Sequence, residues 1–135
     1  MAVHTCDESG HCGHSLERHG VVVGYAGASD FRPRRGYRFC VEDAVYVAAD
    51  EVGRGVGKQL LGELVVQCEA AGARQMVALV GDSANAASLA LHRGLGFSDV
   101  GVMSAVGWKL GRWLDVVVLQ RTLGPGAATL PQERA

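Results

Sequence analysis

The chain of 135 residues lacks a charge excess of either sign and any long apolar run. Its formal net charge is −1, whereas a surface that binds nucleic acid normally carries a basic excess. No apolar run approaches the roughly 20 residues of a membrane span. The first 20 residues contain no apolar segment typical of a signal peptide. These absences favour a globular protein with neither a nucleic-acid partner nor a membrane partner.

Cysteine is scarce, and its spacing follows no known pattern. The four cysteines, at positions 6, 12, 40 and 68, show no paired spacing. We interpret them as reduced thiols in a cytoplasmic protein. The metal-ligating residue types near the N-terminus match no standard zinc spacing, so we predict no metal site there and keep metal binding as the weaker alternative. These residues are His4, Cys6, His11, Cys12 and His14.

Glycine, in contrast, is abundant, and three glycines cluster in one loop. The chain has 19 glycines, about twice the usual share of roughly 7%. An apolar run at 45–49 leads to Gly53, Gly55 and Gly57, and an amphipathic helix follows at once. Glycine lets a backbone approach a ligand closely, and the first amides of a helix have no partner within it. The loop therefore predicts a phosphate site, with a simple flexible turn as the alternative.

Two common phosphate-binding motifs do not fit this loop. In a P-loop four residues separate a first glycine from Gly-Lys-Ser/Thr, but here Val52 takes the position of that first glycine and Gln59 the hydroxyl position. A dinucleotide fingerprint has the form Gly-x-Gly-x-x-Gly, and here its last position falls on Lys58 or Leu60. The loop is therefore predicted to bind neither a nucleoside triphosphate nor a dinucleotide.

Hydrophobic periodicity predicts an α/β architecture in the order β-β-α-β-α-β-β. We expect residues 1–20 to be a disordered tail, residues 21–123 to form one domain, and residues 124–135 to be an unstructured C-terminal tail. The expected strands are 21–26, 39–47, 76–80, 100–106 and 114–119. The expected helices are 58–71 and a second one that Ser83 or Asn85 caps and that runs to Gly96.

That order, with a glycine loop after a strand, resembles the GCN5-related N-acetyltransferase (GNAT) superfamily. Its loop has the form Arg/Gln-x-x-Gly-x-Gly/Ala, in which Gly55 and Gly57 match and Val52 replaces the Arg or Gln. Residues 81–97 look like the Asn…Leu-(Tyr/His)-x-x-x-Gly-Phe helix of the same superfamily. Four segments in order, at 31–34, 41–47, 81–97 and 107–115, are similar to the phosphinothricin and methionine sulfoximine N-acetyltransferases.

The resemblance implies a GNAT fold, a mixed central sheet flanked by helices, here without the usual first strand and two helices. It implies transfer of an acetyl group from acetyl-coenzyme A (acetyl-CoA) to the amine of a small amino-acid-like substrate. The sheet face left uncovered would favour a homodimer. The alternative is a non-catalytic CoA-binding or interaction remnant of such an enzyme.

The resemblance also implies site residues. Glu42 matches the carboxylate that accepts the amine proton, and His92 matches a residue that acts as acid or base. Arg32, Arg34 and Tyr37 would hold the acceptor. From the residues alone, Glu42 reads as a surface carboxylate, His92 as a packing residue and the arginines as loop charges. The implied cofactor residues are Val47, with its amide as an oxyanion donor, and Gly53, Arg54, Gly55, Val56, Gly57, Lys58, Asn85 and Ser88.

Overall fold

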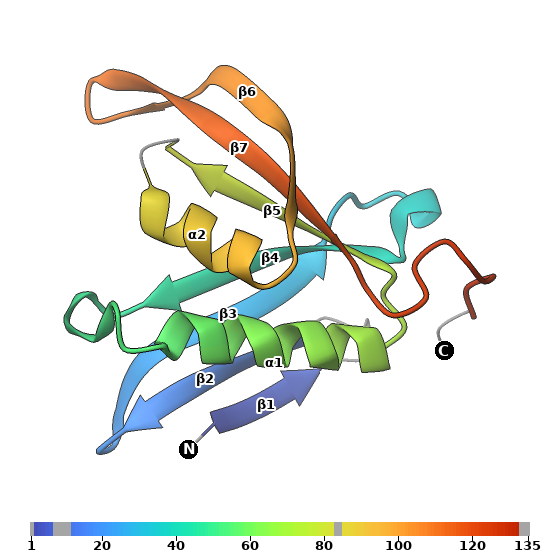
Figure 1. Cartoon of the computed structure of the whole chain (residues 1–135), viewed down its shortest axis with the longest axis horizontal. Coiled ribbons are helices and arrows are strands. Elements are labelled where there is room, and N and C mark those ends of the chain that lie inside the picture. The colour runs from blue at the N-terminus through green and yellow to red at the C-terminus, as the bar shows by residue number, and fades with distance from the viewer. Residues whose placement is uncertain (1, 7–11, 83–84, 133–135) are drawn as a thin grey trace.

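The computed structural model describes residues 2–6, 12–82 and 85–132. These residues form one sheet of seven strands and two α-helices (Figure 1). The elements are β1 (Ala2–Cys6), β2 (Cys12–Arg18), β3 (Val21–Asp30), β4 (Cys40–Val47), α1 (Val56–Ala70), β5 (Gln75–Gly81), α2 (Ala86–Gly94), β6 (Ser98–Lys109) and β7 (Arg112–Thr122), with 3-10 turns at Arg35–Tyr37 and Ala49–Glu51. No described helix is long and apolar enough to cross a membrane.

The sheet is mixed, with the strand order β1-β2-β3-β4-β5-β7-β6. Among the described strands, only β4 and β5 pair in parallel, and every other pairing is antiparallel. The parallel pair needs a crossover connection, which α1 supplies. The predicted α/β class and mixed sheet are therefore confirmed.

The N-terminal segment departs from the prediction of a disordered tail. Residues 2–6 and 12–18 are strands of the sheet, while residues 7–11 lie outside the described part of the chain. Along β2 the side chains alternate, with Cys12, His14 and Leu16 buried. The alternation is hard to recognise in the sequence because one of the inward-facing residues is a histidine. The Nε2 atom of His14 lies 3.4 Å from Glu63 Oε2 on α1.

The cysteines are also corrected in part. Cys12 is disulfide-bonded, whereas Cys40 and Cys68 are not part of a disulfide. The register of β1 and β2 places Cys6 directly opposite Cys12. The sequence shows no paired spacing because this proximity comes from strand pairing.

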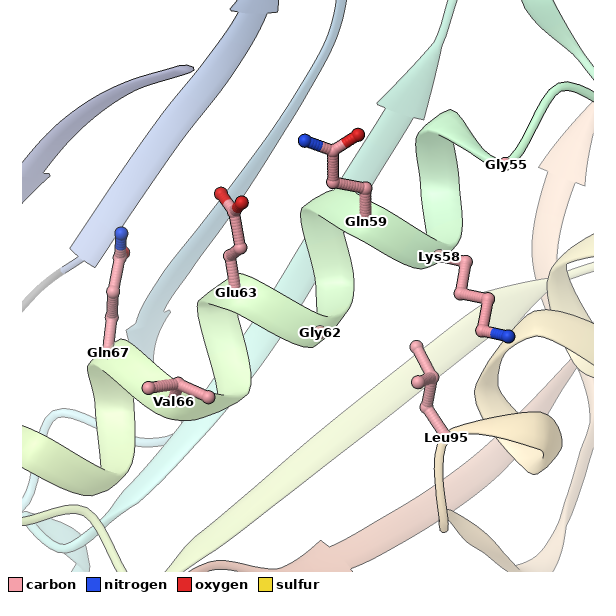
Figure 2. Close-up of a pocket in the computed structure, with 8 residues that line it drawn as sticks. All are labelled: Gly55, Lys58, Gln59, Gly62, Glu63, Val66, Gln67 and Leu95. Atoms are coloured by element: carbon pink, nitrogen blue, oxygen red, sulfur yellow. The ribbon is translucent and has the colours of Figure 1, made fainter. Parts of the chain in front are cut away.

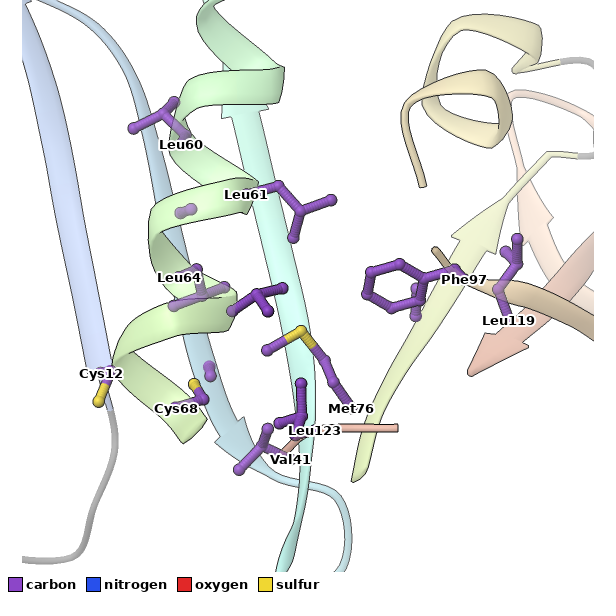
Figure 3. Close-up of a cluster of buried hydrophobic side chains, with 14 of the residues drawn as sticks. Cys12, Val41, Leu60, Leu61, Leu64, Cys68, Met76, Phe97, Leu119 and Leu123 are labelled. Carbon is purple, nitrogen blue, oxygen red and sulfur yellow. The ribbon is translucent and has the colours of Figure 1, made fainter. Parts of the chain in front are cut away.

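The core lies between α1 and the sheet. Leu60, Leu61 and Leu64 are at most 1% exposed and follow helical spacing, so one face of α1 is packed against β2, β3 and β4. Figure 3 shows this cluster, with Met76 from β5 beside it. Full burial of each such side chain stabilises the fold by about 1.5–3 kcal/mol.

Gly24 on β3 lets α1 approach the sheet closely. A Cβ atom at this position would lie 2.7 Å from the Tyr46 carbonyl oxygen and 2.8 Å from Leu60 Cδ1. Any larger residue would push away the first turns of α1, which carry the glycine loop. The position of that loop therefore depends on a small residue on a neighbouring strand.

The two faces of the sheet differ. Figure 1 shows α1 and α2 on the same face. On the opposite face Tyr25 and Tyr46 stack with ring centroids 5.9 Å apart, and both are about half exposed, as is Leu79. No described helix covers these side chains.

The C-terminal residues 124–132 form no helix or strand. They are nonetheless fixed to the end of the sheet. The Arg74 guanidinium donates to the carbonyls of Gly126 at 2.6 Å and of Thr129 and Leu130 at 3.1 Å. This segment therefore has ordered contacts without regular secondary structure.

Candidate active site

A cleft opens where β4 and β5 diverge. The two strands pair at only three positions, the last being Glu42 with Val77, and β4 continues to Val47 without β5 beside it. The cleft has a volume of about 600 Å³, which is within the usual range for small-molecule sites. Its lining comes from β4, the glycine loop, α1 and α2: Val45, Tyr46, Val47, Glu51, Val52, Gly53, Gly55, Val56, Gly57, Lys58, Asn85, Ala87, Ser88 and Leu91.

The glycine loop shapes one end of the cleft. Gly53 and Gly55 have φ angles of 85° and 82°, a region that other residues adopt at a cost. Gly55 caps α1 and makes no side-chain cap hydrogen bond, so the first amides of the helix are available to an anion. At Gly57 a Cβ atom would lie 3.1 Å from Leu91 Cδ2 on α2. The loop therefore combines open amides with close packing between the two helices.

The end of β4 offers further amides to the cleft. The Ala48 N–H donates to the Val23 carbonyl at 2.8 Å, so alternate residues of β4 direct their backbone groups toward β3. The intervening residues, Val45 and Val47, direct their backbone N–H and carbonyl groups away from β3. Within the described residues, β5 gives them no partner there, because its pairing with β4 ends at Glu42. The N–H of Val47 thus faces the cleft, as an oxyanion donor must.

Helix α2 forms the opposite wall. Asn85 caps it by accepting a hydrogen bond from the Ser88 N–H at 3.3 Å, so the predicted cap is correct for Asn85. The alternative cap, Ser83, lies outside the described residues. Sequence reasoning missed Ala87 and Leu91, although Leu91 follows Ser88 by three residues and therefore shares its helix face.

Of two predicted cofactor residues, Lys58 lines the cleft and Arg54 does not. Lys58 lines both the cleft and a shallower groove of about 1000 Å³ along α1. Figure 2 shows its side chain on the same side of α1 as Leu95. Arg54, in contrast, does not line the cleft. Its guanidinium lies 4.0 Å from the buried carboxylate of Glu51, which also lies 3.6 Å from Arg18.

Glu42 lies where the two strands separate. It is the last residue of β4 that pairs with β5, and its side chain is partly buried. Burial, together with the negative charge of neighbouring Asp43, raises the pKa of Glu42 above its usual value. It does not line the cleft described above. A carboxylate at this point is a stronger base than an ordinary exposed glutamate.

His92 is inside the protein, in contact with Asp43. Its Nε2 atom lies 2.8 Å from Asp43 Oδ2, and the two side chains are only 4% and 5% exposed. Its Nδ1 atom lies 2.8 Å from the Ser88 carbonyl oxygen. Burial opposes the charge of the imidazole, but the hydrogen bond to Asp43, the Asp43 charge and the Ser88 carbonyl outweigh it and raise the pKa of His92.

The predicted acceptor residues gather at the start of β4. The Arg32 guanidinium lies 5.4 Å from the Phe31 ring centroid and 5.7 Å from that of Tyr37, within the range of a cation–π contact. The Phe31 N–H donates to the Cys40 carbonyl at 3.3 Å, which places this loop two residues from Glu42. Arg34 is exposed in the same loop. These residues form a group separate from the cleft at the other end of β4.

Comparison with known proteins bears on what this arrangement does. A model described as the acetyltransferase (GNAT) family matches residues 2–97. The phosphinothricin N-acetyltransferase of Alcaligenes faecalis is 52% identical over 116 residues, which are 86% of this chain and 59% of that protein. The L-methionine sulfoximine/L-methionine sulfone acetyltransferase of Pseudomonas aeruginosa strain PAO1 is 49% identical over 106 residues, which are 78% of this chain and 61% of that protein. The chain thus spans about six-tenths of the length of these curated relatives.

Solved structures show the same fold. A GNAT superfamily phosphinothricin acetyltransferase from Sinorhizobium meliloti, in complex with acetyl-CoA, superposes with a TM-score of 0.87 at 50% identity. The match covers 93% of this chain and 68% of that one. A putative acetyltransferase from Salmonella typhimurium, solved with its cofactor acetyl-CoA, gives a TM-score of 0.85 at 40% identity, covering 92% of this chain and 70% of that one.

Proposed function

Because the chain belongs to the acetyltransferase (GNAT) family, we propose that it transfers the acetyl group of acetyl-CoA to the amine of a small amino-acid-like substrate. The phosphinothricin and methionine sulfoximine type is the proposed acceptor class, from the names of the similar enzymes. One structural observation carries the proposal. A cleft lined by unpaired backbone amides lies at the end of β4, in a fold similar to that of enzymes solved with acetyl-CoA.

In this proposal the glycine loop binds the pyrophosphate of acetyl-CoA. The amides of Gly53, Gly55 and Gly57 supply donors at the positive end of the α1 dipole, and Lys58 adds a positive charge. Val52 lines the cleft and stands where the superfamily carries Arg or Gln. The loop therefore lacks that polar side chain but keeps all of its backbone amides.

Glu42 is the proposed general base. The acceptor amine must lose a proton before its nitrogen can attack the thioester carbon, and Glu42 takes this proton directly or through water. The N–C bond then forms, the C–S bond breaks, and the thiolate of CoA leaves. The Val47 N–H is the proposed donor to the oxyanion of the tetrahedral intermediate. Since the pKa of Glu42 is raised, activity should increase with pH up to a higher value than for an ordinary glutamate.

The loop before β4 is the proposed acceptor site. Arg32 and Arg34 present planar guanidinium groups that can hold a carboxylate or phosphinate through two hydrogen bonds. Contacts of Arg32 with the rings of Phe31 and Tyr37 limit its rotamers and so reduce the entropy lost on binding. Because this loop lies near Glu42, an acceptor held by its arginines can place its amine close to the proposed base.

The release of free thiol from acetyl-CoA, with phosphinothricin or methionine sulfoximine as acceptor, tests this function. We expect turnover for the parent protein and a loss of about 100-fold or more in kcat/KM for Glu42→Gln. An Asp99→Asn variant, which alters an exposed carboxylate on β6, is the control and should retain activity. Folded parent protein without thiol release above background would refute the function, and a fully active Glu42→Gln variant would refute only the role of Glu42.

A second candidate is a CoA-binding module without catalysis. It is favoured by the sheet face carrying the exposed side chains of Tyr25, Tyr46 and Leu79, since a substrate on that face would meet solvent where no described helix forms a wall. Calorimetry that detects acetyl-CoA binding, combined with no turnover over a panel of amines, would favour this candidate over the enzyme.

Two further expectations complete the proposal. A homodimer would shield part of the exposed apolar face, and light scattering after size exclusion would measure its mass. A cytoplasmic location is supported by Cys40 and Cys68, which are not part of a disulfide, while the disulfide at Cys12 argues against it. Thiol titration of freshly isolated protein, with and without reductant, would show whether that disulfide forms in cells.

A further inference from the structure

Helix α2 is attached to the protein through few buried side chains. It has nine residues, and only Leu89 and His92 are buried. The rest of one side of the helix faces the cleft, which Ala87, Ser88 and Leu91 line. On the cleft side only Leu91 also packs against the core, so the position of α2 depends strongly on its few other contacts.

His92 supplies a directional contact of this kind. On the β4 side it meets Asp43, with Nε2 2.8 Å from Oδ2. On its own helix it meets the carbonyl of Ser88 at 2.8 Å, and its ring packs edge-on against Phe97 with centroids 4.9 Å apart. The imidazole is thus fixed from three sides, and it joins a residue of β4 to a residue of the cleft wall.

Asp43 occupies an unusual position for a carboxylate. Strand residues alternate in direction, so Asp43 points to the same side as Val41, Val45 and Val47, which belong to or pack against the core. An ionised carboxylate in such a place costs several kcal/mol unless a partner compensates its charge. His92 is the partner, at 2.8 Å, so the loss of either residue leaves the other without its buried contact.

We propose that this ion pair, the Asp43–His92 latch, sets the distance between α2 and β4 and thereby the width of the acetyl-CoA cleft. The inference rests on the proposed function and assigns both residues a positioning role. Asp43 lies one residue from Glu42 and two from Val45, whereas His92 directly follows Leu91. The latch therefore joins the two cleft walls close to the point where the strands diverge.

The same geometry argues against His92 as the acid that protonates the departing thiolate. The Ser88 carbonyl can only accept, so Nδ1 carries a proton, and an ionised Asp43 takes the proton of Nε2 as a second hydrogen bond. Both ring protons are thus engaged. The side chain is 4% exposed and does not line the cleft. Donation to a thiolate there would require one of these buried bonds to break.

A second ion pair of α2 provides a matched control. Arg93, the next residue, donates to Asp99 on β6 at 2.9 Å and 2.7 Å, but both side chains are about half exposed. Water replaces the lost partner when an exposed pair is broken. An Asp99→Asn variant removes an ion pair of the same helix without leaving a buried charge.

The experiment measures acetyl-CoA affinity by calorimetry and backbone hydrogen exchange without ligand. The variants are Asp43→Asn, His92→Gln, the double variant and Asp99→Asn. We expect Asp43→Asn and His92→Gln each to raise the Kd for acetyl-CoA about tenfold. The double variant should raise it by the same tenfold and no more, because the two substitutions remove the same interaction. Exchange should become faster at amides of α2 while α1 stays protected, and Asp99→Asn should match the parent.

The outcomes separate the possible roles. Unchanged affinity in both single variants, or additive losses near 100-fold in the double variant, would overturn the latch. A His92→Gln variant that loses kcat at parental affinity, with Asp43→Asn fully active, would also overturn it and restore His92 as the acid. A parent that binds no acetyl-CoA would instead refute the proposed function, and the cleft-setting role with it. If Asp43→Asn does not fold, the double variant still decides, because two neutral amides replace the pair without a buried charge.

Discussion

The two helices beside the cleft are held to the sheet by different forces. Helix α1 buries six side chains, and all of them are apolar or thiol groups: Val56, Leu60, Leu61, Leu64, Val65 and Cys68. Helix α2 buries only Leu89 and His92, and His92 is bound to a carboxylate. One wall of the cleft is therefore fixed by a large apolar area, and the other by a smaller apolar contact together with one ion pair.

This difference has consequences for how each wall responds to change. Apolar burial is non-directional and hardly depends on pH or salt, so α1 and the glycine loop should keep their place as long as the core is intact. A buried ion pair is directional and depends on the protonation of both partners. The position of α2 should therefore be the more sensitive to pH and to single substitutions.

The largest expected effect is on α1. Leu64→Ala removes a side chain that is 0% exposed and should lower the free energy of unfolding by about 3 kcal/mol. Chemical denaturation measures it. Val66→Ala, on the exposed side of the same helix, is the control and should change stability little. Equal losses in the two variants would contradict the packing assigned to α1.

The pH dependence of stability comes next. The pKa of His92 is raised in the folded protein, so its contribution is fully present below the unfolded pKa, near 6.5, and is lost as the pH increases through the folded pKa. Denaturation of the parent across this window should show a decline that the His92→Gln variant lacks. A decline of the same size in both proteins would assign it to other groups.

The cap of α2 should contribute less. Asn85 accepts a hydrogen bond from the Ser88 N–H, and Asn85→Ala should reduce stability by about 1 kcal/mol. Asn85→Ser keeps a side-chain acceptor and should recover most of this loss. Thermal unfolding of the three proteins measures the effect, and an Asn85→Ser variant as unstable as Asn85→Ala would show that capping is not the cause.

The smallest expected effect is at the exposed pair Arg93–Asp99. The Arg93 guanidinium lowers the pKa of Asp99 through their hydrogen bond, yet both side chains are in contact with solvent. Asp99→Asn should leave thermal unfolding unchanged within error, and added salt should not alter this result. A measurable loss would mean that α2 depends on its exposed pair as well as on the buried one.

The sequence predicted the elements whose signals are local. The strands, both helices and the glycine loop follow from apolar spacing and from the residues that cap or end a helix, and their bounds differ from the prediction by a few residues. It failed for β1 and β2, and along β2 a buried His14 interrupts the apolar alternation. A charged residue at an inward position, such as Asp43 between Val41 and Val45, is a signal for a buried partner, but it does not identify the partner.

Two features therefore have different origins. The shape of the glycine loop was determined by the sequence, because positive φ angles at Gly53 and Gly55 and open amides at a helix start are properties of a few adjacent residues. The meeting of Asp43 and His92, 49 positions apart, was decided only by the tertiary structure. Local preferences fix the direction in which each side chain points, whereas strand pairing and helix packing decide which distant side chain it meets.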